Sequence, residues 1–168
     1  GELLLHWQPE VSLATGEPIS VEALVRWSHP TRGVLAPAEF IPVAERADLM
    51  GPLLRWVVNA ALEQCHKWQA AGIELPVSVN MSVRNLVDPQ LGKVIERHLT
   101  KWQVDPSMLT LEITESAALM EMARSLQNLS TLRRLGVRLS IDDFGTCYSS
   151  MTYLDQLPVN ALKIDKSF

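Results

Sequence analysis

The stretch Leu109-Thr110-Leu111-Glu112-Ile113-Thr114 alternates aliphatic and polar residues and carries a carboxylate on its polar side. Successive side chains of a β-strand point to opposite faces, so this alternation predicts a strand with one aliphatic and one polar face. Four more stretches share the pattern, over residues 21–26, 77–80, 137–142 and 161–165. The polar sides of the five stretches carry Glu22, Asn80, Glu112, Asp142 and Lys163.

These five polar residues would converge on one interior if the strands are neighbours in a sheet. Buried charge is costly unless it is paired or holds a metal ion. Three carboxylates, an amide and an amine in one place therefore indicate an active site rather than a device for stability.

The composition is that of an ordinary soluble globular protein and is sufficient for one domain with a real core. The chain has 168 residues, of which 47% are hydrophobic, and its net charge is −4. This charge argues against a surface for long nucleic acid, although a small anionic ligand is compatible if metal ions meet its phosphates. Cys65 and Cys147 are too few for a disulfide framework and fit a reducing compartment.

The sequence contains neither an apolar run of the ~20 residues that cross a membrane nor a signal peptide. We therefore expect a cytoplasmic domain that makes no membrane contact itself. The chain begins without Met and stops at Phe168, just past a predicted strand. We expect it to be a piece of a longer protein, which a separate segment could tether to a membrane.

Strands and helices are expected to alternate along the chain. Strands are predicted over residues 3–8, where Pro9 ends the strand, and over 19–27, followed by a loop over 28–33. Helices are predicted from Pro37, over residues 53–70, from Asp88-Pro89, up to Gly136 and near 150–154.

Alternating strands and helices favour parallel βαβ units, and polar residues at the carboxyl ends of strands favour a (β/α)8 barrel. A doubly wound sheet is the competing fold, because its sites also lie at the carboxyl ends of strands. No glycine-rich phosphate loop follows the first predicted strand, which weighs against that competitor.

The paired aspartates of Asp142-Asp143-Phe144-Gly145 are the most informative motif. Two carboxylates at a strand end can serve two metal ions, an arrangement that suits phosphodiester hydrolysis. Oxygen and amide ligands favour Mg²⁺ or Mn²⁺ over zinc. The plainer alternative is a helix N-cap, and Asn80 likewise has a plainer reading as a turn residue.

Two further residues leave alternatives open. Lys163 can stabilise phosphate charge or polarise a water, or it can form a salt bridge with Asp165 or Glu112. Glu115 lies on the face opposite Glu112 or just beyond the strand, so the two do not form a simple metal-binding pair and Glu115 is expected to organise a neighbouring loop.

Taken together, five motifs in this order resemble the EAL domain family of cyclic di-GMP-specific phosphodiesterases. They are Glu22-Ala23-Leu24, Asn80-Met81-Ser82, Glu112-Ile113-Thr114-Glu115, Asp142-Asp143-Phe144-Gly145 and Lys163-Ile164-Asp165. The resemblance implies a (β/α)8 TIM-like barrel with an antiparallel first strand, of which this chain covers about six of eight strands. We expect residues 1–168 to form one EAL domain that lacks its C-terminal end.

The resemblance also implies roles for individual residues. Glu22, Asn80, Glu112 and Asp142 would bind one Mg²⁺ or Mn²⁺ ion and Asp143 a second, while Lys163 would contact the attacking water or the scissile phosphate. The implied substrate-binding residues are Gln8, Leu24 and Arg26. Glu115 would hold the loop after Asp142, and Asp165 would support the site. A homodimer, and GGDEF or sensory domains in the full-length protein, are further expectations.

The chain departs from the family pattern in two places. Cys147 stands where the family usually has glycine, which costs of order 1 kcal/mol if this position needs a positive φ. The chain also stops before the family's last two strands, which carry a further catalytic Glu and a Gln.

The predicted activity is metal-dependent hydrolysis of cyclic di-GMP to linear pGpG in bacterial second-messenger signalling. The alternative is a catalytically inactive EAL domain that acts as a cyclic di-GMP receptor or protein-interaction module. A third hypothesis is an unrelated metal-dependent barrel enzyme.

Overall fold

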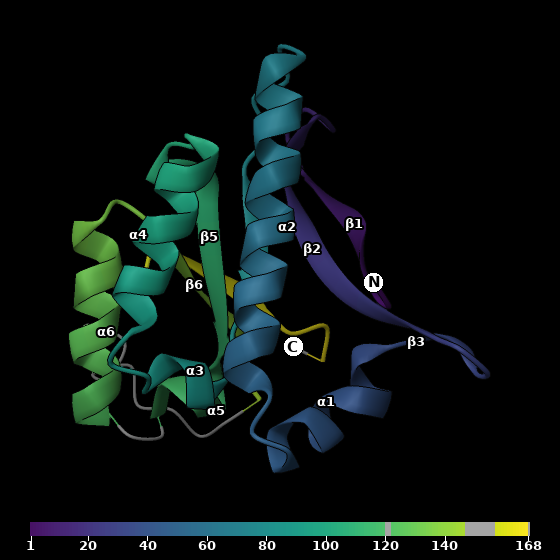
Figure 1. Ribbon diagram of the computed structural model, residues 1–168. Coiled ribbons are helices and arrows are strands. Elements are labelled where there is room, and N and C mark those ends of the chain that lie inside the picture. Colours follow the sequence, from purple (N-terminus) through teal and green to yellow (C-terminus); the bar gives the residue numbers. More distant parts are fainter. Residues whose placement is uncertain (120–121, 147–156, 168) are drawn as a thin grey trace.

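The computed structural model describes residues 1–119, 122–146 and 157–167 and shows one mixed sheet with helices packed on it (Figure 1). The strands are β1 Leu3–Val11, β2 Pro18–His29, β3 Gly33–Leu35, β4 Val77–Asn80, β5 Leu109–Thr114, β6 Arg138–Phe144 and β7 Ala161–Ile164. The helices are α1 Pro37–Arg46, α2 Met50–Ala70, α3 Val83–Leu86, α4 Leu91–Trp102, α5 Glu115–Leu119 and α6 Met122–Arg134, with a 3-10 helix η1 at Pro106–Met108.

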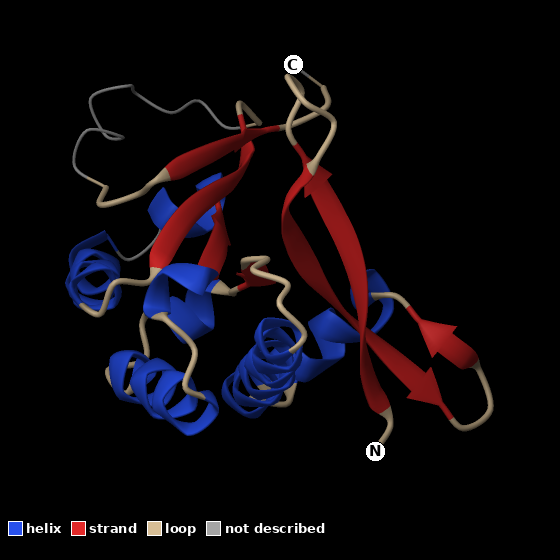
Figure 2. Cartoon of the chain, turned by 90° about the horizontal axis from the view of Figure 1, so that it is seen from above, coloured by secondary structure: helices blue, strands red, loops and turns tan. Residues whose placement is uncertain are grey.

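The sheet follows the chain in the order β1-β2-β4-β5-β6-β7, and the short β3 pairs with β2 beside this path. β1 runs antiparallel to β2, and each later neighbour in this order is parallel to the strand before it. The helices lie on one side of the parallel strands (Figure 2). This is the order of a partial (β/α)8 barrel with an antiparallel first strand, as predicted. The doubly wound alternative is wrong, because that fold needs helices on both faces.

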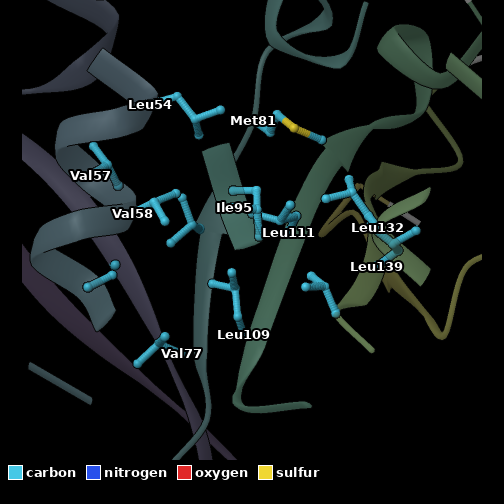
Figure 3. Close-up of a cluster of buried hydrophobic side chains, with 14 of the residues drawn as sticks. Leu54, Val57, Val58, Val77, Met81, Ile95, Leu109, Leu111, Leu132 and Leu139 are labelled. Atoms are coloured by element: carbon cyan, nitrogen blue, oxygen red, sulfur yellow. The ribbon is translucent and has the colours of Figure 1, made fainter. Parts of the chain in front are cut away.

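The aliphatic face of the sheet forms the core. Leu109 and Leu111 of β5 and Leu139 of β6 are fully buried, as are Val58 of α2 and Ile95 of α4. Figure 3 shows these side chains meeting between the helices and the strands. The strand alternation thus separates the two faces as the sequence predicts, with the helices covering the aliphatic one.

The first strand is longer than predicted. β1 continues through Pro9 to Val11, and Pro9 lies opposite Val21 of β2. The Val21 N–H donates to the Pro76 carbonyl on the far side of β2, so Pro9 and Val21 form a non-hydrogen-bonded pair. Pro9 therefore has no ladder bond to lose, and the expectation that it ends the strand is wrong.

Other predicted boundaries also move. β2 extends to His29, and β3 occupies part of the region predicted as a loop over 28–33. The helix predicted from Asp88-Pro89 begins at Leu91, because the Asp88 carboxylate accepts the Gln90 N–H in a turn before the helix.

Helix α2 begins at Met50 rather than Leu53, and the short α3, capped by Ser82, was not predicted. Gly136 follows α6 with φ +91°, as its predicted role as a helix stop requires. The helix expected near residues 150–154 lies outside the described residues, as does Cys147. None of the described helices has the length and apolar character that a membrane crossing needs.

Candidate active site

Lys163 of β7 is the centre of a charged cluster on the polar face of the sheet. Its Nζ lies 2.9 Å from both carboxylate oxygens of Glu112 on β5. It also lies 3.0 Å from Glu10 on β1 and 3.5 Å from Glu22 on β2. One ammonium group therefore joins carboxylates from three strands. Of the two alternatives for a Lys163 salt bridge, the structure has Glu112 and not Asp165.

Asn80 joins the cluster through Glu22. Its Nδ2 donates to Glu22 Oε1 at 2.6 Å, and strand register places Asn80 beside Glu112. Asn80 is the last residue of β4, so its position follows from parallel strands that end at the same edge of the sheet. Sequence alternation thus brings Glu22, Asn80, Glu112 and Lys163 together.

Burial and neighbouring charges shift the pKa values of Glu112 and Lys163 in this cluster. The Glu112 side chain is 1% exposed, and burial, with repulsion from Glu22 and Glu10, raises its pKa although Lys163 acts against the rise. Burial alone would lower the pKa of Lys163, but its hydrogen bonds to Glu112 and Glu10 raise the pKa above its ordinary value. Three carboxylates around one ammonium leave an excess of negative charge, so the cluster favours a further cation.

Asp142, Asp143 and Asp165 form a second acidic group near the ends of β6 and β7. Burial and repulsion from Asp142 and Asp165 raise the pKa of Asp143, while Lys163 lowers it. Asp143 is exposed and has φ 53°, a left-handed conformation inside β6, where the pairing with β7 shifts register between Ile141 and Phe144. Within the described residues, neither Asp142 nor Asp143 makes a direct bond to the Lys163 cluster.

Glu115 holds the loop that follows these aspartates. It is the first residue of α5, just beyond β5, and its Oε2 accepts the Gly145 N–H at 3.0 Å. Gly145 has φ +100°, where a side chain would strain the backbone. A buried carboxylate therefore fixes the start of the loop after Asp143.

The predicted substrate-binding residues lie on the first two strands. Gln8 is exposed and lies opposite Glu22 in the register of β1 and β2. Leu24 and Arg26 follow Glu22 at every second position of β2 and so share its face of the strand. Leu24 and Asn80 line a largely apolar cavity of about 240 Å³ beside α1 and α2. The Arg26 guanidinium donates to the Val25 carbonyl at 2.9 Å.

Glu10 is a member of the cluster that the sequence predictions missed. Gln8 and Glu10 are two residues apart and therefore share a face of β1, which is a usable signal. The signal was lost because the strand was expected to end at Pro9. Ser20, opposite Glu10 on β2, donates a hydrogen bond to its carboxylate.

The donor set of this cluster fits a hard divalent cation in its chemistry. Glu22 and Glu112 offer carboxylate oxygens, and Asn80 keeps an amide oxygen while its nitrogen bonds to Glu22. Across the described ranges, no three His, Cys, Asp or Glu side chains are arranged as a metal-binding group. The Lys163 ammonium lies among the carboxylates that a cation would need.

Comparisons with known proteins agree on one family. A cyclic di-GMP phosphodiesterase of Pseudomonas aeruginosa, PA2567, is 41% identical over 164 residues, which are 98% of this chain and 28% of that protein. The solved PaMucR phosphodiesterase in complex with c-di-GMP has a TM-score of 0.94 at 40% identity, covering 99% of this chain and 68% of that one. The FimX EAL domain of Pseudomonas aeruginosa bound to c-di-GMP has a TM-score of 0.89 at 27% identity, covering 99% and 66%.

The chain spans between 20% and 28% of the length of these curated relatives. The family model described as the EAL domain matches residues 1–168. The predicted resemblance is therefore confirmed, and this chain belongs to the EAL domain family.

Proposed function

We propose that this domain hydrolyses cyclic di-GMP to linear pGpG with the help of two divalent cations, Mg²⁺ or Mn²⁺. The observation that carries the proposal is the convergence of Glu22, Asn80, Glu112 and Lys163 from four strands on one partly buried site. The relatives named as a cyclic di-GMP phosphodiesterase and as a phosphodiesterase complex with c-di-GMP support the choice of substrate.

The proposed metal ligands divide between the two acidic groups. Glu22, Asn80, Glu112 and Asp142 would hold one cation, and Asp143 would reach the second. Bound divalent cations lower the pKa of water and neutralise charge on a phosphodiester. The excess of negative charge in the Lys163 cluster supports this use.

Other side chains act on the substrate directly or fix the site. Lys163 supplies a permanent positive charge for the scissile phosphate, since its raised pKa keeps it protonated. Gln8, Leu24 and Arg26 would bind the dinucleotide beside the apolar cavity. Glu115 would keep Asp143 in place through Gly145, and Asp165 would support the loop end, where it accepts the Ser167 N–H at 2.8 Å.

A receptor that binds cyclic di-GMP without hydrolysis is the second candidate. The observation that favours it is the Lys163 ammonium, which engages both oxygens of Glu112, one of the proposed metal ligands. Cys147, where the family usually has glycine, points the same way. Cys147→Gly discriminates the two, since a strong rise in turnover at constant ligand affinity would show that the loop limits catalysis.

The full-length protein is also proposed to be a cytoplasmic homodimer that carries GGDEF or sensory domains. One of its relatives is named as a bifunctional diguanylate cyclase and cyclic di-GMP phosphodiesterase, MucR of Pseudomonas aeruginosa. Light scattering of the purified full-length protein tests the dimer.

In the deciding experiment, the full-length protein is incubated with cyclic di-GMP and Mg²⁺ or Mn²⁺, and the pGpG formed is measured by chromatography. Glu22→Ala should abolish product formation. Glu17 is an exposed carboxylate in the β1–β2 turn, and Glu17→Ala should leave turnover unchanged. Binding of intact cyclic di-GMP without product in the unmodified protein would establish the receptor instead.

A further inference from the structure

Lys163 is held by carboxylates from strands that are far apart in the sheet. Glu112 of β5 accepts its ammonium with both oxygens, and Glu10 of β1 lies 3.0 Å from the same nitrogen. β1 and β7 are the first and last strands in the order of the described sheet. The ion pair between Glu10 and Lys163 therefore crosses the polar face from one edge strand to the other.

Glu10 is the partner of Lys163 that has no proposed role as a cation ligand. One oxygen of Glu10 accepts a hydrogen bond from Ser20, and the other oxygen pairs with Lys163. Glu22 and Glu112 are proposed to bind a cation as well as Lys163, which is possible because each carboxylate has two oxygens with several lone pairs. Glu10 is thus the carboxylate that serves Lys163 alone.

Glu10 lies on the side of the cluster away from most of the proposed substrate-binding residues. It is opposite Ser20, two residues before Glu22 on β2, whereas Leu24 and Arg26 come after Glu22. At a rise of about 3.4 Å per residue, the levels of Glu10 and Leu24 are roughly 14 Å apart along the strands. Glu10 can therefore act on the substrate through Lys163 rather than by contact.

The ammonium of Lys163 benefits from a second anchor because its side chain is long and lies beside open space. Its four-carbon stem is flexible, and Lys163 and Glu10 both line a hollow of about 500 Å³ on the polar face. Glu112 holds the ammonium from the middle of the sheet, and Glu10 holds it from the edge strand β1. A displacement of about 1 Å at a reacting centre can cost on the order of a hundredfold in rate, so this second contact bears on catalysis.

We propose that Glu10 is a positioning residue that holds the Lys163 ammonium where it meets the scissile phosphate. The inference rests on the proposed function, since it concerns the part that Lys163 plays in that reaction. Lys163 keeps its contact with Glu112, and Glu10 adds a second restraint from β1. Loss of Glu10 should therefore impair turnover rather than the binding of cyclic di-GMP or of the cation.

Steady-state hydrolysis of cyclic di-GMP by the full-length protein with Mn²⁺ tests the proposal, and Mn²⁺ calorimetry counts the folded sites. Glu10→Gln should lower kcat per site about tenfold and change KM and Mn²⁺ affinity less than about twofold, because the amide keeps the size of the side chain but not its charge. Glu10→Asp, which keeps the charge on a shorter side chain, should recover part of the lost kcat. Glu17→Gln removes a charge from the turn of the same hairpin and should behave as the unmodified protein does.

Ser20→Ala separates positioning from plain charge. This variant keeps the Glu10 carboxylate but removes its hydrogen-bond donor, so kcat should fall about twofold to threefold with KM unchanged. Glu10→Asp and Ser20→Ala decide the question if Glu10→Gln folds too poorly to bind Mn²⁺.

Three results would overturn the proposal while leaving the proposed function intact. They are an unchanged kcat in Glu10→Gln, a loss confined to KM or Mn²⁺ affinity, and a kcat in Ser20→Ala equal to that of the unmodified protein. Absence of pGpG from the unmodified protein would instead refute the proposed hydrolysis, and this inference with it.

Discussion

The two faces of the sheet come from the same strands, yet they differ in the polarity and charge of their side chains. On one face, residues such as Val79, Leu111 and Ile141 are fully or almost fully buried beneath helices. On the other, Glu112 and Lys163 are brought together with Glu10 and Glu22. Leu111 and Glu112 are adjacent in sequence and both buried, but only one of them needs an ion partner.

This difference divides the residues that stabilise the fold from those that the proposed activity would use. Aliphatic burial stabilises the fold without any directional requirement. The polar face carries charges whose desolvation is costly, and it depends on the rigidity that the aliphatic face supplies. Substitutions on neighbouring residues should therefore produce different kinds of defect.

The largest effect is expected on the aliphatic face. Leu111→Ala should lower the free energy of unfolding by about 3 kcal/mol, because it leaves a cavity in a fully buried site. Thr110→Ala, one residue earlier and on the polar face, should cost less than about 1 kcal/mol. Urea denaturation of both variants measures the contrast, and equal losses would contradict the division between the faces.

A smaller loss is expected from the polar face when its cation is removed. Lys163→Met should destabilise the metal-free protein by about 2 kcal/mol, since the three carboxylates then lack a positively charged partner. Added Mn²⁺ should restore the lost stability in this variant by mass action. A thermal melt with and without Mn²⁺ checks this, and an unchanged melting temperature in the metal-free variant would speak against it.

Next in size is the loop anchor at the carboxyl end of the strands. Glu115→Ala removes the acceptor of the Gly145 N–H and should cost about 1–2 kcal/mol. It should also reduce pGpG formation well beyond any loss of folded protein, because Asp143 is then less well placed. Glu96→Ala on the exposed side of α4 is the matched control, and similar turnover in the two variants would exclude the anchoring role.

The smallest effect concerns pH and Glu10. Burial alone would raise the pKa of Glu10, but hydrogen bonds from Ser20 and Lys163 lower it below the ordinary value of 4.5. Ionised Glu10 therefore stabilises the fold above about pH 4.5. This contribution is lost as pH falls through the lowered folded-state pKa. Glu10→Gln should reduce the loss of unfolding free energy at acid pH by less than about 1 kcal/mol. Urea unfolding at several pH values measures this. The same pH dependence in the variant and the unmodified protein would argue against the ion pair.

Strand alternation made most of the sheet and its polar set predictable. Period-two patterns in residues 109–114 and 137–142 identify both the strand and its aliphatic face, because the aliphatic residues of each strand are the ones buried beneath the helices. The convergence of Glu22, Asn80, Glu112 and Lys163 then follows from parallel order. Metal binding by these residues stays a prediction.

Features that depend on tertiary register were not predictable in the same way. Pro9 ends a strand by its intrinsic preference, and only the pairing with Val21 makes it harmless. The missed role of Glu10 is a direct result, since the strand that carries it was cut short. Helix α3 was not predicted, because it is short and is stabilised by its Ser82–Asn85 capping bonds rather than by a long apolar stripe.

The antiparallel first strand also bears on the order in which the chain folds. β1 pairs with β2 through one short turn, so these contacts join residues close in sequence. Val21 finds Val77 only after the long helix α2 has been placed between them, and loop closure becomes costlier with length. Hairpins form in about 1–10 μs, far faster than parallel pairing across a crossover. The strand that runs against the others is thus the one that can find its partner before the rest of the chain is in place.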